Sequence, residues 1–235
     1  MSFKLEQIRR DLIANAKSSE LWDLVDVYGK QLDIKLNEAM AQGVLIAEKD
    51  PLKFVASLIT SMDRNVPIIL GNHQWGESEW VLFDQLFSPA VIFGLQKSTD
   101  GNQPIFKEKD QGSILIPTGG TSSDALRFAI HRWESLEAQS LMVQTFLGDK
   151  AINSICCLPL FHVSGLMQVI RAIASNGQIL FSQLNELESA SKLVAVEDFC
   201  LSLVPTQLSR LISKGFIFEK MDKFKAIFLG GAPTS

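Results

Sequence analysis

The sequence predicts an α/β protein with doubly wound, mostly parallel sheets and flanking helices. Short runs rich in Val, Ile and Leu are bounded by Gly, Pro or Asn, which is typical of strands. Longer amphipathic stretches separate these runs, as in βαβ units. With 46% hydrophobic and 20% charged residues, the 235-residue chain is globular and long enough to bury a sizeable core.

The first half of the chain opens with helical periodicity. Apolar residues fall on one helical face at Leu5, Ile8, Leu12 and Ile13, and again between Leu21 and Leu32. A further helix is predicted from Pro51, because proline suits the first helical turn. This helix spans 51–64, and the predicted strands are 44–47, 66–70, 90–93 and 113–116.

The second half repeats the alternation of strands and helices. The predicted strands are 154–158, 178–181, 199–204 and 225–229, and the helices are 164–175, 185–197 and 205–214. The polar stretch 97–112 contains two glycines and a proline and is the best candidate for a linker. We therefore predict a helical and α/β subdomain over 1–112, ending in this linker, and a second α/β subdomain over 113–235.

Composition excludes several classes of protein. A formal charge of −4 without a clustered basic face argues against nucleic acid as a partner. No run approaches the roughly 18–20 apolar residues of a membrane span, and the start lacks the apolar core of a signal peptide, so we expect a cytoplasmic location. Cys156, Cys157 and Cys200 have no metal-ligand spacing and are expected to be small buried hydrophobes. We predict no metal ligand in this chain, and the sequence leaves the oligomeric state open.

A loop rich in glycine and hydroxyls follows the predicted strand 113–116. It reads Thr118-Gly119-Gly120-Thr121-Ser122-Ser123. Glycines allow close approach of the backbone to a ligand, and successive N–H groups with hydroxyls can bind phosphate oxygens. The alternative is an ordinary surface turn, because Gly, Ser and Thr are common in turns.

A second segment joins the predicted strand 154–158 to the helix 164–175. Its sequence is Leu158-Pro-Leu-Phe-His-Val-Ser-Gly, and Arg171 lies seven residues after Ser164. Seven residues are two helical turns, so Ser164 and Arg171 can face one pocket. A helix N-terminus favours an anion, and arginine can bind a carboxylate with two hydrogen bonds. A structural histidine and a surface arginine are the alternative interpretations.

These two segments, with Gly230-Gly231-Ala232-Pro233, resemble the adenylate-forming acyl-CoA ligases. Within that family they look like the o-succinylbenzoate–CoA ligases of menaquinone and phylloquinone synthesis. The family loop reads Thr-Ser-Gly-Thr-Thr-Gly-x-Pro-Lys-Gly; Thr118, Gly120 and Thr121 match it, while Leu126 stands at the lysine position. Arg127, one residue later, could supply the missing positive charge.

The resemblance implies a role for each segment. It assigns the ATP phosphates to Thr118, Gly119, Gly120, Thr121, Ser122, Ser123 and Arg127. It assigns the acyl group to His162, Ser164, Gly165 and Arg171, and adenine to Gly230, Gly231, Ala232 and Pro233. ATP, Mg²⁺ and coenzyme A would be the cofactors and substrates, and Arg171 would bind the second carboxylate of o-succinylbenzoate.

The resemblance also implies that the chain is the N-terminal part of such a ligase, truncated at its end and without the C-terminal domain. No catalytic residue is assigned within this portion, because the family's Mg²⁺-holding glutamate and catalytic lysine would lie beyond it. Two alternatives stay open: another aryl- or acyl-CoA synthetase, and a non-catalytic remnant that only binds ligand.

Overall fold

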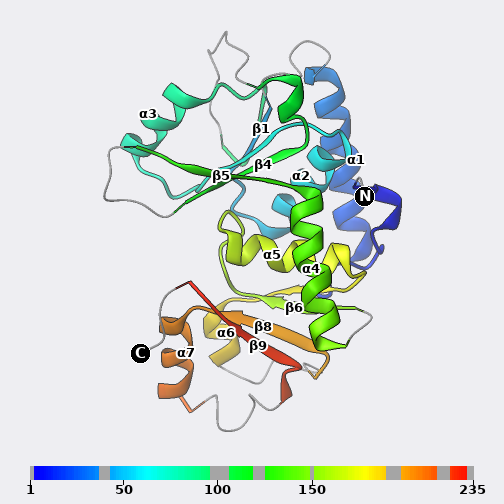
Figure 1. Ribbon diagram of the computed structural model, residues 1–235, viewed down its shortest axis with the longest axis vertical. Helices are drawn as coiled ribbons and strands as arrows, with labels where there is room; N and C mark the ends of the chain where they lie inside the picture. The colour runs from blue at the N-terminus through cyan, green and yellow to red at the C-terminus, as the bar shows by residue number, and fades with distance from the viewer. Residues whose placement is uncertain are drawn as a thin grey trace. The chain divides into compact units, whose positions relative to one another are not determined.

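Two β-sheets, one in each of two compact units, organise the chain (Figure 1). The computed structural model describes residues 3–36, 43–95, 106–118, 125–148, 151–188, 197–215 and 223–231. The first unit contains the chain through Glu6 and Ser18–Leu136. The second contains Gln7–Lys17 and everything from Glu137 onward.

The first unit has a five-stranded sheet in the order β3-β1-β2-β4-β5. Every neighbouring pair is parallel except β4 and β5, which are antiparallel and bring Pro117 opposite Phe128. The strands are β1 (Val44–Ile46), β2 (Ile68–Leu70), β3 (Val91–Phe93), β4 (Ser113–Pro117) and β5 (Phe128–Arg132).

Helices α1 (Ser18–Leu36), α2 (Pro51–Asp63) and α3 (Glu77–Leu86) belong to the first unit, as does a short 3₁₀ turn at Glu108–Asp110. Another 3₁₀ turn, Leu5–Gln7, ends at the first residue of the second unit. The Asp50 side chain caps α2 by accepting hydrogen bonds from the amides of Leu52 and Lys53, at 2.9 and 3.0 Å. The aromatic side chains of Phe83 and Phe106 are buried with sheet residues in the core beside α3.

The second unit has an all-parallel sheet in the order β7-β6-β8-β9. Its strands are β6 (Asn153–Cys156), β7 (Ile179–Phe181), β8 (Phe199–Leu203) and β9 (Ala226–Leu229). Helix α4 (Trp133–Leu147) starts in the first unit and continues in the second. The other helices are α5 (Val163–Ala174), α6 (Leu184–Glu188) and α7 (Pro205–Ser213).

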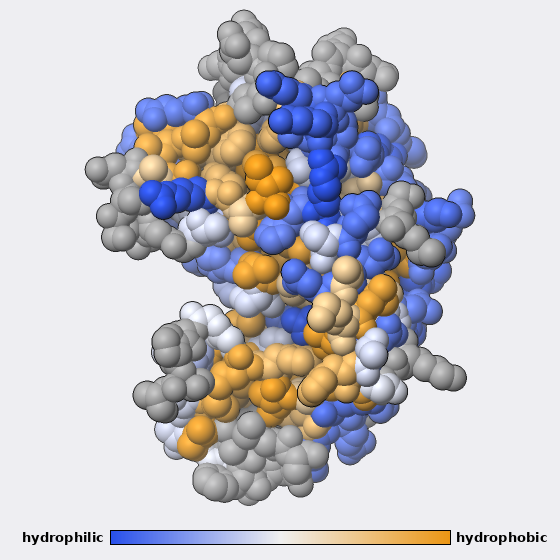
Figure 2. Space-filling view, in the orientation of Figure 1, coloured by the Kyte–Doolittle hydropathy of each residue, from blue (hydrophilic) through white to orange (hydrophobic). Residues whose placement is uncertain are grey.

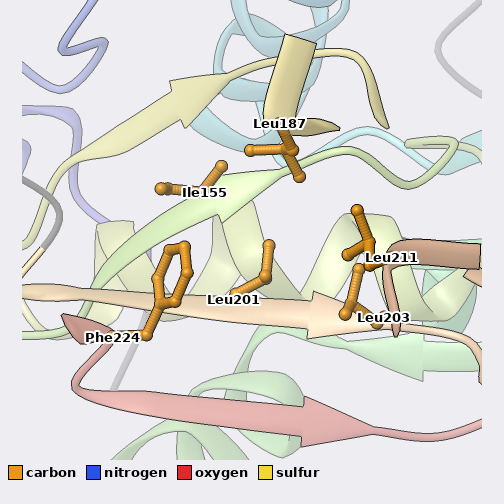
Figure 3. Packing of buried hydrophobic residues seen from close by; sticks show 6 residues of the cluster. All are labelled: Ile155, Leu187, Leu201, Leu203, Leu211 and Phe224. Carbon is orange, nitrogen blue, oxygen red and sulfur yellow. The ribbon is translucent and has the colours of Figure 1, made fainter. Parts of the chain in front are cut away.

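The two faces of the second sheet are covered differently. On one face, Ile155, Leu187, Leu201, Leu203, Leu211 and Phe224 form an apolar core between β6, β8, α6 and α7 (Figure 3). Because side chains alternate along a strand, the neighbours of Ile155 and Leu201 point to the opposite face, toward α5. These neighbours are small and buried: Ser154, Cys156, Cys200 and Ser202.

The expected fold class is confirmed, with corrections in detail. The helix expected around Leu5–Ile13 is wrong, because only Leu5–Gln7 is helical and Ile13 forms a β-bridge with Ile179. Strand β5 and helices α3 and α4 were not predicted from the sequence. The unit division falls after Leu136 rather than after residue 112, because β4 and β5 complete the first sheet.

Two expected segments lie partly outside the described residues: 97–105 of the linker and 189–196 of the helix 185–197. In the described part of the chain, each helix is too short or too polar to cross a membrane.

Candidate functional site

Helix α5 begins at the carboxyl end of β6, where parallel sheets bind ligands. Gly165 allows this helix to start against the preceding turn. A side-chain carbon at this position would lie 2.1 Å from the carbonyl oxygen of Pro159 and 2.9 Å from that of Leu158. Gly165 is therefore required by packing, which is a firmer role than the ligand contact expected from the sequence.

Arg171 and Ser164 share helix α5, as the seven-residue spacing predicts. Arg171 is only 9% exposed. Its Nε donates a hydrogen bond to the carbonyl oxygen of Met167 at 3.0 Å, which turns the side chain back toward the start of α5. Ser164 is partly buried at that start. The alternative of an exposed surface arginine is therefore excluded.

The guanidinium of Arg171 lies over the ring of Phe228 on β9, with 4.8 Å from Cζ to the ring centroid. Burial lowers the pKa of Arg171, and the nearby Cys200 and Cys156 thiols oppose this effect. In the described ranges, each ion pair joins other residues, so no carboxylate neutralises this buried cation. A buried charge without an anionic partner is costly, and an anionic ligand would remove that cost.

Gln168 lies between Ser164 and Arg171 on the same helix, and it is fully buried. Its Nε2 donates to the carbonyl oxygen of Ser164 at 3.3 Å, but none of the described residues donates to its Oε1. The hydroxyl of Ser154, on the sheet face below α5, also has no partner in the described part of the chain. One polar atom on α5 and one on β6 are thus buried without a partner among the described residues.

His162 precedes α5 and makes no side-chain capping bond to it. The imidazole is exposed and packs on Phe161, with ring centroids 4.4 Å apart. Partial burial lowers the pKa of His162 below the ordinary histidine value, so the ring is neutral at pH 7. A neutral ring beside an uncapped helix N-terminus can border an apolar or aromatic acyl group without adding charge.

The glycine pair after β9 lies beside the end of β8. The amide of Gly230 donates to the carbonyl oxygen of Leu203 at 3.2 Å. Gly231 has φ +93°, a conformation that side chains strongly disfavour, and it approaches Val204. Apolar side chains gather on the surface over β9 (Figure 2). Ala232 and Pro233 lie outside the described residues.

The glycine–hydroxyl loop is described only at its two ends, since Gly119, Gly120, Thr121, Ser122 and Ser123 lie outside the described residues. Thr118 directly follows β4, and its amide donates to the carbonyl oxygen of Arg127 at 2.9 Å. Leu126 packs against the aromatic core beside α3, whereas the Arg127 side chain is exposed. The Leu126 side chain therefore contributes to the core. The Arg127 side chain is an exposed cation at this end of the loop.

The structure assembles some predicted residues and separates others. His162, Ser164, Gly165, Arg171 and the Gly230-Gly231 pair belong to the second unit, whereas Thr118 and Arg127 belong to the first. Sequence reasoning missed Phe228 and Gln168. The i+4 spacing from Ser164 to Gln168 was available in the sequence, but nothing there places Phe228 against Arg171.

The described residues contain no group of three His, Cys, Asp or Glu side chains that could hold a metal ion. Cys156 and Cys200 are buried, as the sequence predicts, whereas Cys157 is only partly buried, and all three are free. Burial raises the pKa of Cys156 to about 12 and that of Cys157 to about 11, so both remain thiols at neutral pH.

Comparison of the sequence with known proteins gives one related ligase. No family model matches the sequence. A 2-succinylbenzoate–CoA ligase of Enterococcus faecalis is 28% identical over 125 residues, which are 52% of this chain and 25% of that protein. The chain therefore aligns with only a quarter of this curated relative.

Solved structures give the same fold. A double mutant of o-succinylbenzoate CoA synthetase from Bacillus subtilis, bound to the product analogue OSB-NCoA, superposes with a TM-score of 0.72 at 15% identity. That match covers 94% of this chain and 50% of the synthetase. ATP-bound MatB from Rhodopseudomonas palustris gives a TM-score of 0.67 at 14% identity over 89% of this chain and 49% of MatB. The expected likeness to adenylate-forming ligases and the fold of their N-terminal part are both confirmed.

Proposed function

We propose that this chain is the N-terminal part of an ATP-dependent acyl-CoA ligase whose acid substrate is o-succinylbenzoate. The buried guanidinium of Arg171 carries the proposal, because no carboxylate in the described ranges pairs with it. A substrate with a second carboxylate supplies that partner. The likeness to the Enterococcus faecalis ligase supports the same substrate.

In the proposed reaction, the reacting carboxylate of the substrate attacks the α-phosphorus of ATP and pyrophosphate leaves. The thiolate of coenzyme A then attacks the acyl carbon of the acyl-adenylate, and AMP leaves. The side chains described here bind and orient rather than transfer protons. By the resemblance, the glutamate that helps to hold Mg²⁺ would belong to parts of a longer ligase.

Each part of the site has a proposed task. Arg171 binds the second carboxylate, helped by Ser164 and by the N-terminus of α5, which has no side-chain cap. His162 and Gly165 border the acyl group. The loop from Thr118 to Ser123 holds phosphates with Arg127 as its cation, and the segment from Gly230 to Pro233 contacts adenine. A cytoplasmic location belongs to the same proposal.

Calorimetric titration with two stable acyl-adenylate analogues tests the substrate. The o-succinylbenzoyl analogue should bind the wild-type chain more tightly than the benzoyl analogue, which lacks the second carboxylate. Arg171→Met keeps most of the side-chain volume but removes the charge, so it should weaken the first analogue by about tenfold or more. It should leave the benzoyl analogue nearly unaffected.

Arg171→Lys is the matched control, since it keeps the charge and loses the planar pair of donors. Partial retention of the preference in Arg171→Lys is expected. Equal binding of both analogues by the wild type would contradict o-succinylbenzoate as the substrate and favour a general aryl-CoA ligase.

A second candidate is a chain that binds the ligand without activating it. The packed Leu126, at the family's lysine position, favours this reading because it removes one cation from the phosphate loop. ATP–pyrophosphate exchange by the purified chain distinguishes the two. Exchange that depends on o-succinylbenzoate would support the ligase, whereas tight analogue binding without exchange would support a binding function.

A further inference from the structure

A segment near the N-terminus belongs to the second unit, although its neighbours in sequence belong to the first. Gln7–Lys17 groups with the second unit, while the residues before Gln7 and those from Ser18 group with the first. Its main chain pairs with the edge strand β7. The amide of Ile179 donates to the carbonyl oxygen of Leu12, and the amide of Ala14 donates to that of Ile179, both at 2.8 Å.

Side chains extend this pairing beyond the single bridge. Asn15 Nδ2 donates to the carbonyl oxygen of Phe181 at 2.8 Å, and the Phe181 amide donates to Asn15 Oδ1 at 3.3 Å. The carboxamide therefore imitates one more residue of a β-ladder. We call Arg9–Asn15 the N-terminal strap.

The other end of the strap forms hydrogen bonds with the turn that follows α5. Arg9 Nη1 donates to the carbonyl oxygen of Asn176 at 3.2 Å, and Gln178 Nε2 donates to both the carbonyl and the carboxylate of Asp11 at 2.9 Å. Asn176 adopts φ +56°, the left-handed conformation that ends a helix. An ion pair between Arg9 and Asp11, at 2.7 Å, fixes both side chains for these contacts.

Apolar burial accompanies the hydrogen bonds. Leu12 is 0% exposed and Ile13 is 6% exposed, so the strap contributes to the core rather than lying loosely on the surface. Exposed sheet edges readily accept an additional strand, and the strap occupies the β7 edge in this way. The segment that covers the β7 edge is therefore the strap, which comes from this same chain.

The turn held by the strap is directly connected to Arg171. The amide and the hydroxyl of Ser175 both donate to the Arg171 carbonyl oxygen, at 3.0 and 2.7 Å. Ser175 Oγ in turn accepts from the amide of Ile152 at 2.8 Å. The next residue, Asn176, already contacts the strap, because its carbonyl oxygen accepts a hydrogen bond from Arg9.

We propose that the N-terminal strap is the fifth strand of the second sheet and that it positions α5, and with it Arg171, by holding the α5–β7 turn. The strap is thus a positioning element and makes no contact with substrate. The part of this proposal that concerns ligand binding rests on the proposed function, whereas the strand pairing does not.

Amide hydrogen exchange of the whole chain tests the pairing. Asn15→Ala removes both side-chain bonds to Phe181, and Asn15→Asp keeps only the acceptor. The Phe181 amide should exchange about tenfold faster in Asn15→Ala and by an intermediate factor in Asn15→Asp, because the edge opens locally. Lys17→Ala is the control, since Lys17 is exposed and makes no described contact.

Amides of the central strands, such as those of Ile155 and Leu201, should exchange as in the wild type. Unchanged exchange at Phe181 would overturn the pairing. Equal acceleration of every amide in the second sheet would also overturn it, since the segment would then support only global stability.

Analogue binding tests the effect on Arg171. In Asn15→Ala the preference for the o-succinylbenzoyl over the benzoyl adenylate analogue should fall severalfold, with benzoyl binding unchanged. A fully retained preference, with faster Phe181 exchange, would overturn the positioning role while leaving the strand pairing intact. If the wild type itself has no preference, the proposed substrate fails, and the exchange experiment still decides the pairing.

Discussion

Helices α2 and α5 occupy equivalent places, since each follows a central strand of its sheet, yet their polar groups are treated differently. In α2 the N-terminus is capped by Asp50, and each buried hydroxyl has a partner: Ser57 and Ser61 donate within the helix, and Thr60 donates to the Val25 carbonyl oxygen in α1. In α5 the N-terminus has no side-chain cap, Oε1 of the buried Gln168 has no partner among the described residues, and the buried Arg171 forms no ion pair with any of them. The contrast shows that the polar groups of α2 are more fully satisfied within the described residues than those of α5, and the predictions below test what this costs in stability.

The largest expected effect comes from adding one methyl group at the start of α5. Gly165→Ala would place a carbon 2.1 Å from the Pro159 carbonyl oxygen, so α5 must shift away from the strand. We expect the free energy of unfolding, measured with denaturant, to fall by about 3 kcal/mol or more. Gly230→Ala is the matched control, because its added carbon meets nothing within 4 Å. A Gly165→Ala chain as stable as Gly230→Ala would contradict this account of the helix start.

Capping gives a smaller effect that should differ between the two helices. Asp50→Ala removes both capping bonds of α2, so it should lower the free energy of unfolding by about 1 kcal/mol. His162→Ala removes no capping bond and should change it by less than about 0.5 kcal/mol. Thermal or chemical denaturation of the two variants checks the difference. Equal losses would show that His162 supports α5 in a way that its side-chain contacts do not indicate.

The smallest expected effect comes from replacing the buried Gln168 of α5, and here stability should not fall. Gln168→Met keeps a similar shape and removes the unpaired Oε1, at the expense of one 3.3 Å bond to Ser164. We expect the free energy of unfolding to stay constant or rise by about 1 kcal/mol, because an unsatisfied buried acceptor is destabilising. Ser57→Ala in α2 is the control and should be destabilising, since that hydroxyl is paired to Phe54. A clear loss of stability in Gln168→Met would mean that Oε1 is satisfied by bound water.

Local patterns predicted where most of the strands and helices lie, although not how the strands pair. The apolar runs located all but one of the strands, and the spacing of Ser164 and Arg171 placed both on one helix. The spacing of Leu5, Ile8, Leu12 and Ile13 wrongly predicted a helix. The apolar side chains of an extended segment such as the strap can have the same spacing as one face of a helix. What decides the matter is a partner strand far along the chain, which no local window contains.

The candidate site was predictable in its residue types but not in its contacts. Arginine at a helical offset indicated anion binding, yet its burial and its stacking on Phe228 depend on how β9 packs beside α5. Gly165 was predicted to border a ligand, and the structure adds a steric requirement against Pro159 that the sequence did not indicate. These features arise from tertiary packing, which a single sequence does not specify residue by residue.

The strap gives the chain a definite order of assembly. Asn15 and Phe181 are 166 positions apart, and nearly the whole first unit lies between them. At a synthesis rate of about 5–20 residues per second, the strap waits roughly ten to thirty seconds for β7. The first unit therefore has time to fold as an insertion within the second, and the second sheet closes by a contact of very long sequence separation. Folding of the second unit should thus be the slower of the two events.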